Sequence, residues 1–321
     1  MSSTCRWLLM FAAAALFSSA SAARLTEVKS FGPDPGNLRM FVHAPSAAQG
    51  LRPLVVVLHG CTQKAKRIAV LSGWNELADT AGCYVVYVQQ RTINNSLRCF
   101  NWFREQDIKP GEGEVGSVAS MVRYALAHYP IDPARVYLYG VSSGGALAAA
   151  LTACEPDLFA GVGIFAGAPY RAANNTLHAR QVIRNPQMLE PAQWGRLVTD
   201  LHPQRTKPYA PVIVVHGTND GVVDMGHGQA LVAQWTAVAK TDSTADRVDD
   251  PYNANAAVRR SEYHASDGRT VVVFYKVQGL GHQLPIDPGQ GKRQGGKRSW
   301  VSRDLDFHST YVLAKEWGLV E

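Results

Sequence analysis

Continuous apolar runs alternate with stretches of helical periodicity along most of the chain. The runs, which are typical of strands buried on both faces, cover residues 54–58, 84–88, 136–139, 161–165, 212–215 and 271–275. Apolar positions with helical spacing predict helices over residues 69–81, 113–129, 143–153, 226–239 and 303–317. Strands that alternate with helices in this way predict an α/β fold, with a mostly parallel sheet covered by helices on both faces.

Other segments define the edge and the extent of the predicted domain. Residues 25–31 and 37–43 alternate between apolar and polar positions around a turn, which predicts an antiparallel hairpin at the amino-terminal edge of the sheet. No Pro-, Ser- or Thr-rich linker divides the chain, so we expect a single domain over residues 23–321. Residues 168–210 form a long insertion, which we expect to act as a cap or wall over the site. The basic segment 287–298 predicts a mobile, solvated surface loop.

The first 22 residues have the pattern of a secretory signal peptide. Arg6 precedes an apolar run over residues 7–17, and Ala20-Ser21-Ala22 fits an A-x-A cleavage site. The run is shorter than the roughly 20 residues that a membrane-spanning helix needs. Arg6 before the run and the small residues after it fit a retained membrane anchor less well than a cleaved signal peptide. We therefore expect cleavage after Ala22 and a secreted protein, extracellular or periplasmic, that is not bound to a membrane once the peptide is removed.

Composition narrows the class of protein. The 321 residues are 46% hydrophobic and 18% charged, which is ordinary for a globular protein and excludes disordered, collagen-like and multi-span membrane proteins. The net charge of +6 is weak support for a polyanionic partner, so we expect no nucleic-acid binding. The sequence has no C-x-x-C or H-E-x-x-H spacing, so we expect neither a metal site nor a cofactor. We expect a monomer.

The segment Gly140-Val141-Ser142-Ser143-Gly144 matches the G-x-S-x-G pattern of a nucleophile elbow. It follows a predicted strand directly and opens a helix of small residues, which is the context that the pattern requires. Ser142 has glycine on both sides at the required spacing, whereas Ser143 would need glycine at position 141, which is valine. We therefore expect Ser142 to be the nucleophile and Ser143 to offer a backbone N–H.

A serine nucleophile needs a histidine base and an acid that orients the histidine. In folds with a G-x-S-x-G turn, these residues follow along the chain in the order Ser, acid, His. Asp220 comes directly after one predicted strand, and His282 follows another strand through Gly279-Leu280-Gly281. Both therefore lie at the carboxyl ends of strands, where sites form in α/β sheets. Asp224 is the rival acid, but it is better placed to begin the next helix. The remaining candidates are expected to be structural or badly placed: His216, His264 and His308.

The oxyanion of an acyl-transfer intermediate needs preorganised N–H donors. The segment His59-Gly60-Cys61 follows the strand over residues 54–58, where this fold class places its oxyanion loop. We expect the backbone N–H groups of Cys61 and Ser143 to form the oxyanion hole. His59 is expected to pack and to shape the loop.

Four cysteines remain after the signal peptide, and export predicts two disulfides with three possible pairings. Cys61 and Cys99 each follow a strand, at the active-site edge of the sheet. Cys83 precedes a strand and Cys154 ends a helix that runs away from Ser142, so both belong to the opposite edge. The pairing predicted from this placement is Cys61–Cys99 and Cys83–Cys154; free buried thiols are the alternative.

Motifs across most of the chain resemble those of secreted esterases that include short-chain polyhydroxyalkanoate (polyhydroxybutyrate) depolymerases and related feruloyl and acetylxylan esterases. They lie at residues 36–40, 58–63, 99–103, 140–145, 166–170, 216–220, 279–282 and 314–319. The resemblance implies an α/β-hydrolase fold and a triad of Ser142, Asp220 and His282. It also places Asn101 and Trp102 near the substrate cleft, although Trp102 fits core packing equally well.

The sequence thus predicts a secreted serine ester hydrolase. Hydroxyalkanoate esters, polymeric or oligomeric, are the leading substrates, and feruloyl or acetyl esters on plant polysaccharide are the alternative. Many polymer depolymerases carry a linker and a polymer-binding domain after the catalytic part, whereas this sequence ends with the predicted terminal helix. We therefore expect any adsorption to a polymer to use the surface around the cleft. The same triad also serves serine peptidases, and a non-catalytic binding protein is a further alternative.

Overall fold

The computed structural model describes residues 25–46 and 49–321. The predicted signal peptide therefore lies outside the described residues. Within the described ranges, no helix has both the length and the apolar character that crossing a membrane requires.

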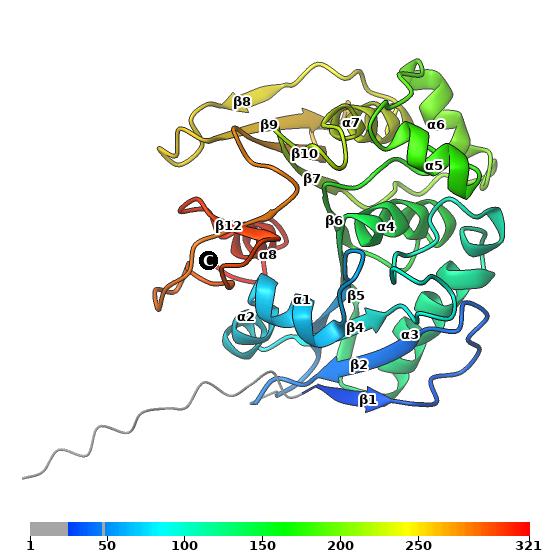
Figure 1. Cartoon of the computed structure of the whole chain (residues 1–321), viewed down its shortest axis with the longest axis vertical. Coiled ribbons are helices and arrows are strands. Elements are labelled where there is room, and N and C mark those ends of the chain that lie inside the picture. Colours follow the sequence, from blue (N-terminus) through cyan, green and yellow to red (C-terminus); the bar gives the residue numbers. More distant parts are fainter. Residues whose placement is uncertain (1–24, 47–48) are drawn as a thin grey trace, which may run out of the picture.

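A ten-stranded mixed sheet runs through the molecule, in the order β1-β2-β4-β3-β5-β6-β7-β10-β9-β8 (Figure 1). Its strands are β1 (Thr26–Val28), β2 (Arg39–His43), β3 (Arg52–Leu58), β4 (Tyr84–Gln89), β5 (Ile131–Val141), β6 (Gly161–Phe165), β7 (Val212–Gly217), β8 (Arg247–Asp249), β9 (Val258–His264) and β10 (Thr270–Val277). The six central strands, β4-β3-β5-β6-β7-β10 in their spatial order, all pair in parallel. Antiparallel strands flank them on both sides. The predicted parallel sheet with an antiparallel amino-terminal edge is confirmed.

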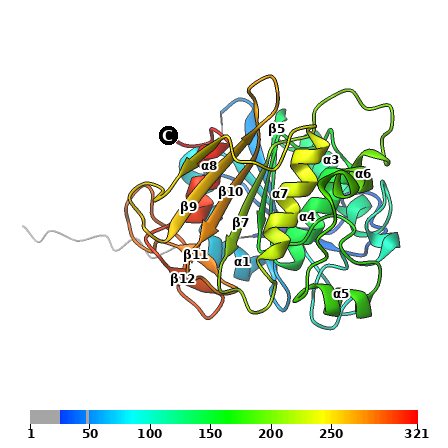
Figure 2. The ribbon, with the colours of Figure 1, turned by 90° about the horizontal axis from the view of Figure 1, so that it is seen from above.

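Helices cover both faces of this sheet. The helices are α1 (Ala65–Ser72), α2 (Trp74–Ala81), α3 (Gly113–His128), α4 (Ser143–Cys154), α5 (Thr176–Val182), α6 (Pro191–Thr199), α7 (Gly226–Val238) and α8 (Ser309–Glu316). Helices α1, α2 and α8 lie on one face, and α3, α4, α6 and α7 lie on the other (Figures 1 and 2). Side chains alternate between the two cores: Leu54 and Val56 of β3 pack on the α3–α4 side, and Val55 packs on the α1–α2 side.

Several predicted boundaries differ from the structure. The helix predicted over residues 69–81 is two helices, because Gly73 adopts φ 72° between α1 and α2. The predicted carboxy-terminal helix begins only at Ser309, since β12 (Ser302–Asp304) pairs with β11 (Leu284–Ile286) before it. Helices α5 and α6 lie within the predicted insertion 168–210, and β8 and β9 were not predicted.

The cysteine pairing is half right. Cys61 and Cys99 form a disulfide with their Cα atoms 4.2 Å apart. The predicted Cys83–Cys154 bond is wrong, because both thiols are free and buried. Cys83 packs in the α1–α2 core, whereas Cys154 packs in the α3–α4 core, so the sheet separates them. Placing both residues at the same edge of the sheet was not enough to pair them, because they lie on opposite faces.

Candidate active site

The turn between β5 and α4 presents Ser142 at the carboxyl edge of the sheet. Ser142 has φ 56° and ψ −120°, a backbone conformation that non-glycine residues rarely adopt. Glycines on either side make the turn possible. A Cβ on Gly140 would lie 2.2 Å from the Gly144 carbonyl oxygen, and one on Gly144 would lie 2.5 Å from the Leu58 carbonyl oxygen. The predicted nucleophile elbow is therefore formed by close backbone packing.

The side chains of Ser142, His282 and Asp220 form one hydrogen-bonded chain. The Oγ of Ser142 lies 2.9 Å from His282 Nε2, and His282 Nδ1 lies 2.7 Å from Asp220 Oδ2. Asp220 follows β7 and His282 follows β10, as the sequence predicts. A base held against the hydroxyl and oriented by a carboxylate is the arrangement that activates a serine nucleophile.

The surroundings of Asp220 favour its charged form. Its Oδ1 accepts hydrogen bonds from the backbone N–H groups of Val222 and Val223, each at 2.9 Å. The Nε2 of His216 lies 3.6 Å from Oδ2 and donates to the Val223 carbonyl. Burial alone would raise the pKa of the Asp220 carboxyl, but the imidazoles of His216 and His282 together hold that pKa below its usual value. An ionised Asp220 can accept the Nδ1 proton of His282.

The rejected candidates lie away from this chain of hydrogen bonds. Asp224 accepts a hydrogen bond from the Gly226 N–H at the start of α7, 2.7 Å away. His264 pairs with Glu262, and His308 Nε2 bonds to the Ser72 carbonyl. His216 is structural in the sense predicted, although its contact with Asp220 was not foreseen.

The predicted oxyanion loop lies beside Ser142. A Cβ built on Gly60 would lie 3.4 Å from the Ser142 Cβ. Among residues 25–46 and 49–321, the Cys61 N–H donates no hydrogen bond. Ser143 is the first residue of α4, where backbone N–H groups have no acceptor within the helix and the helix dipole favours negative charge. Both predicted donors are thus available for an oxyanion.

A buried histidine fixes the direction of the loop. His59 is fully buried, and the Gln90 backbone N–H donates to its Nε2 at 3.1 Å. The ring proton must then lie on Nδ1, which donates to the Gly60 carbonyl at 2.7 Å. Burial lowers the pKa of His59 to about 4, so the ring is neutral at neutral pH. Because the Gly60–Cys61 peptide is planar, holding its carbonyl also sets where the Cys61 N–H points.

A cavity of about 420 Å³ opens at Ser142. Its wall is mainly apolar and includes Leu97, Trp102, Phe103, Ala146, Ile183, Val222 and Val223, together with the disulfide-bonded Cys61 and Cys99 and the residues Arg104 and Arg180. Trp102 lines the cavity and also packs against Phe103 in a small buried cluster, so both interpretations of this residue hold a place in the structure. Thr176, Ala179 and Arg180 of α5 line the cavity too, so part of the predicted insertion stands beside the site.

Asn101 is not among the residues that line this cavity. Its side chain is 2% exposed, and its amide bonds to Glu114 and Asn95. Asn101, which the resemblance places near the substrate cleft, is therefore next to Trp102 in the chain but outside the lining of the cavity. A loop has no regular periodicity that would tell which of two adjacent residues lines a cavity, so the sequence alone could not separate Asn101 from Trp102.

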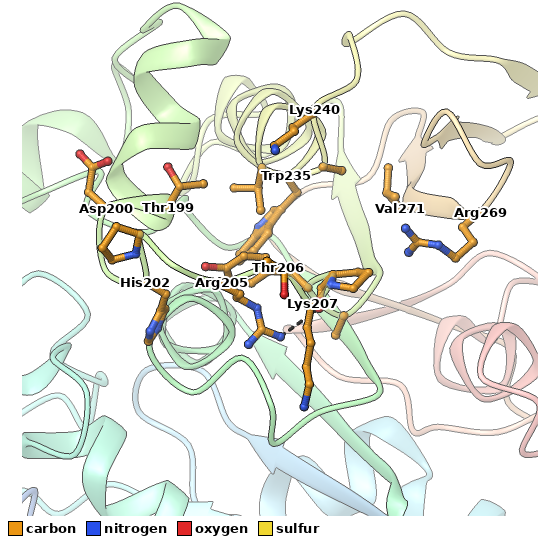
Figure 3. A pocket seen from close by; sticks show the side chains of 16 residues that line it. Thr199, Asp200, His202, Arg205, Thr206, Lys207, Trp235, Lys240, Arg269 and Val271 are labelled. Atoms are coloured by element: carbon orange, nitrogen blue, oxygen red, sulfur yellow. Dashed lines mark hydrogen bonds between the residues drawn. The ribbon is translucent and has the colours of Figure 1, made fainter.

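A second cavity, of about 600 Å³, lies at the opposite edge of the sheet, near the amino ends of β7 and β10 (Figure 3). Trp235 lies at its centre, and Lys207 and Lys240 extend away from each other on opposite sides of it. Arg205 is already paired with Asp157 at 3.1 Å. None of the triad residues lines this cavity, so the cavity at Ser142 is the candidate active site.

Comparison with known proteins gives a consistent assignment. Residues 39–250 match the family model of the esterase PHB depolymerases. A poly(3-hydroxyalkanoate) depolymerase C of Paucimonas lemoignei is 37% identical over 314 residues, which cover 97% of this chain and 75% of the relative. The chain belongs to the esterase PHB depolymerase family. It is therefore a carboxylic ester hydrolase of the serine esterase type.

Other relatives are named as feruloyl and acetylxylan esterases. An acetylxylan esterase of Coprinopsis cinerea is 30% identical over 274 residues, covering 82% of this chain and 70% of the relative. A solved acetyl xylan esterase from Aspergillus awamori superposes with a TM-score of 0.74 at 20% identity, over 81% of this chain and 94% of that one. This likeness shows that the PHB depolymerase family member described here has the α/β-hydrolase fold.

Proposed function

We propose that the protein is a secreted serine ester hydrolase that cleaves poly- or oligo-3-hydroxybutyrate esters through an acyl-enzyme. The observation that carries the proposal is the hydrogen-bonded chain of Ser142, His282 and Asp220 opening onto an apolar cavity. The 37% identity with a poly(3-hydroxyalkanoate) depolymerase over 97% of the chain supports the substrate class.

Each group has a defined role in the proposed reaction. Ser142 Oγ attacks the ester carbonyl while His282 Nε2 takes its proton, and Asp220 stabilises the resulting imidazolium. The carbonyl electrons move onto the oxygen, which the Cys61 and Ser143 N–H groups stabilise. One such donor contributes on the order of 10²–10³ in rate. The tetrahedral intermediate then expels the alcohol, which receives the proton from His282. Water, activated by the same imidazole, releases the acid and regenerates Ser142.

The cavity wall offers apolar contacts to a polyester chain. Leu97 and Val222 line the cavity and are 60% and 50% exposed. Such exposed apolar side chains can contact the methyl-bearing backbone of a hydroxybutyrate chain. Feruloyl or acetyl esters of plant polysaccharide are the second candidate, because sequence relatives are named feruloyl esterase B and acetylxylan esterase.

Secretion has two lines of support. Residues 1–22 have the charge, apolar run and small-residue site of a signal peptide. The Cys61–Cys99 disulfide fits an oxidising compartment, because such bonds are rare in reducing cytosol.

The test is product release from an amorphous poly(3-hydroxybutyrate) suspension by the purified chain without residues 1–22. We expect hydroxybutyrate acids with wild type and none with Ser142→Ala. This variant should fold normally, because the Ser142 side chain lines the cavity and does not pack in a hydrophobic core. Acetylated and feruloylated xylan are assayed in parallel. Turnover of those esters without release from the polyester or its soluble oligomers would overturn the substrate assignment.

A further inference from the structure

Glu114 is a completely buried carboxyl group to which the proposed reaction assigns no chemical step. It is the second residue of α3, with 0% exposure. Its Oε2 accepts the Asn101 backbone N–H at 2.8 Å, and its Oε1 accepts the Asn101 side-chain amide at 2.9 Å. The Gln90 side-chain amide makes a short third hydrogen bond to Oε1. A buried charge is costly, so a carboxyl group with three N–H donors converging on it calls for an explanation.

One line of contacts leads from Glu114 to the oxyanion loop through Gln90. The Gln90 side-chain amide is held by Glu114 and also donates to the Cys99 carbonyl at 3.3 Å. The Gln90 backbone N–H then donates to His59, whose Nδ1–H holds the Gly60 carbonyl. This carbonyl belongs to the peptide that carries the Cys61 N–H. Displacement of Gln90 would therefore change the direction of a predicted oxyanion donor.

A second line of contacts leads to the same place through Asn101. The two Asn101 hydrogen bonds fix the chain that follows Cys99, and Cys99 is covalently bound to Cys61. The intervening Phe100 N–H donates to Ser143 Oγ at 3.3 Å. Both predicted oxyanion donors, Cys61 and Ser143, thus belong to residues that are tied to a loop held by Glu114.

We propose that Glu114 is a positioning residue for the oxyanion hole, acting through Gln90 and Asn101 on Cys61 and Ser143. The inference rests on the proposed function, since it assigns a role to the same hole. Glu114 touches neither substrate nor the reacting atoms. Its contribution is preorganisation, which matters because misplacing a catalytic group by about 1 Å can cost 10²-fold in rate.

The three N–H donors are satisfied only if both side-chain oxygens of Glu114 accept hydrogen bonds. The Asn101 backbone N–H cannot turn around. The Gln90 amide cannot turn without losing the bonds that its oxygen accepts from the Arg91 N–H at 2.9 Å and the Asn94 amide at 2.7 Å. Glu114→Gln would replace one carboxylate oxygen with an NH₂ group that faces one of these donors. The substitution keeps the shape of the side chain and breaks the pattern.

The test compares Glu114→Gln with wild type on a short soluble ester. We expect kcat to fall about 10- to 100-fold, which does not exceed the rate loss of about 10²–10³ on removing a whole oxyanion donor. KM should change by less than about threefold. The inhibition constant of a trifluoromethyl ketone should rise by the same factor as kcat/KM falls, because Ser142 adds to this ketone and its oxygen then occupies the hole. A merely structural role would not move that constant in proportion.

A matched control separates positioning from stability. Tyr87→Phe removes a buried hydrogen bond to Asn75, 2.5 Å long, on the α1–α2 side of the sheet. It should lower Tm but leave kcat and the inhibition constant unchanged. If Glu114→Gln fails to fold, Gln90→Met tests the first line of contacts, with the same expected direction in both constants.

Two results would overturn the proposal: kcat and the inhibition constant both within about threefold of wild type in a folded Glu114→Gln or Gln90→Met variant, or equal losses in Tyr87→Phe. Failure of the proposed function would look different. In that case the wild-type protein itself would show no Ser142-dependent ester hydrolysis.

Discussion

Replacing Asp220 with asparagine tests the electrostatic logic of the triad, because the structure dictates how the new amide must turn. Asp220 Oδ1 accepts two backbone N–H groups at 2.9 Å, and Oδ2 accepts the His282 Nδ1–H at 2.7 Å. Asparagine has one oxygen. Turning its NH₂ toward the two backbone donors would leave both of them unpaired and buried, at about 1–3 kcal/mol each. The oxygen therefore stays with the backbone and the NH₂ faces His282.

This orientation forces His282 into the wrong tautomer. Nδ1 must now accept, so the ring proton moves to Nε2 and faces Ser142 Oγ, where the base is needed. In a serine protease the equivalent change lowers kcat about 10⁴-fold, which corresponds to roughly 5 kcal/mol of transition-state stabilisation. We expect a loss of this size for Asp220→Asn, with a Tm close to that of wild type.

The matched control is Asp224→Asn. Among the described residues, the side chain of Asp224 accepts only the Gly226 N–H, at 2.7 Å, and an amide oxygen can keep that bond. Both variants are assayed on a short soluble ester, and their melting is followed by circular dichroism. We expect Asp224→Asn to retain activity within about threefold of wild type. Asp220→Asn with more than a tenth of wild-type kcat, or equal losses in the two variants, would refute the assignment of Asp220.

Two further predictions concern the cysteines. Reduction should lower the free energy of unfolding by about 3–4 kcal/mol, because the Cys61–Cys99 bond closes a loop with a sequence separation of 38. Peptide mapping should recover Cys61 linked to Cys99, and thiol titration after unfolding should find Cys83 and Cys154 free. A peptide that links Cys83 to Cys154 would contradict the structure.

The apolar pattern was sufficient to predict the central sheet. Strands β3, β4, β6 and β7 are buried along nearly their whole length, so their sequences are continuous apolar runs. Strand β9 escaped prediction because it contains Arg260, which is buried and pairs with Glu316 at 2.9 Å. This charged residue breaks the local apolar pattern, and although it pairs with Glu262 in the same strand, its partner Glu316 is more than fifty positions away. No pattern within the strand itself could reveal that pairing.

The site was predictable to the extent that chemistry leaves a local signature. The G-x-S-x-G turn marks Ser142, and the ends of strands mark Asp220 and His282. The supporting residues have no such signature. Glu114 looks like an ordinary acidic residue in the first turn of a helix, which the helix dipole alone would explain, and Gln90 looks like a polar residue after a strand. Only the fold shows that they meet behind the oxyanion loop.

The most direct test of the central claim is to trap the nucleophile. The purified protein is treated with a fluorophosphonate, digested and mapped by mass spectrometry, with Ser142→Ala and Ser143→Ala alongside. The account predicts one stoichiometric adduct on Ser142, present in Ser143→Ala, absent in Ser142→Ala, and paralleled by complete loss of ester hydrolysis. An adduct on Ser143 or on a serine outside the elbow, or full ester hydrolysis after Ser142 is labelled, would contradict it.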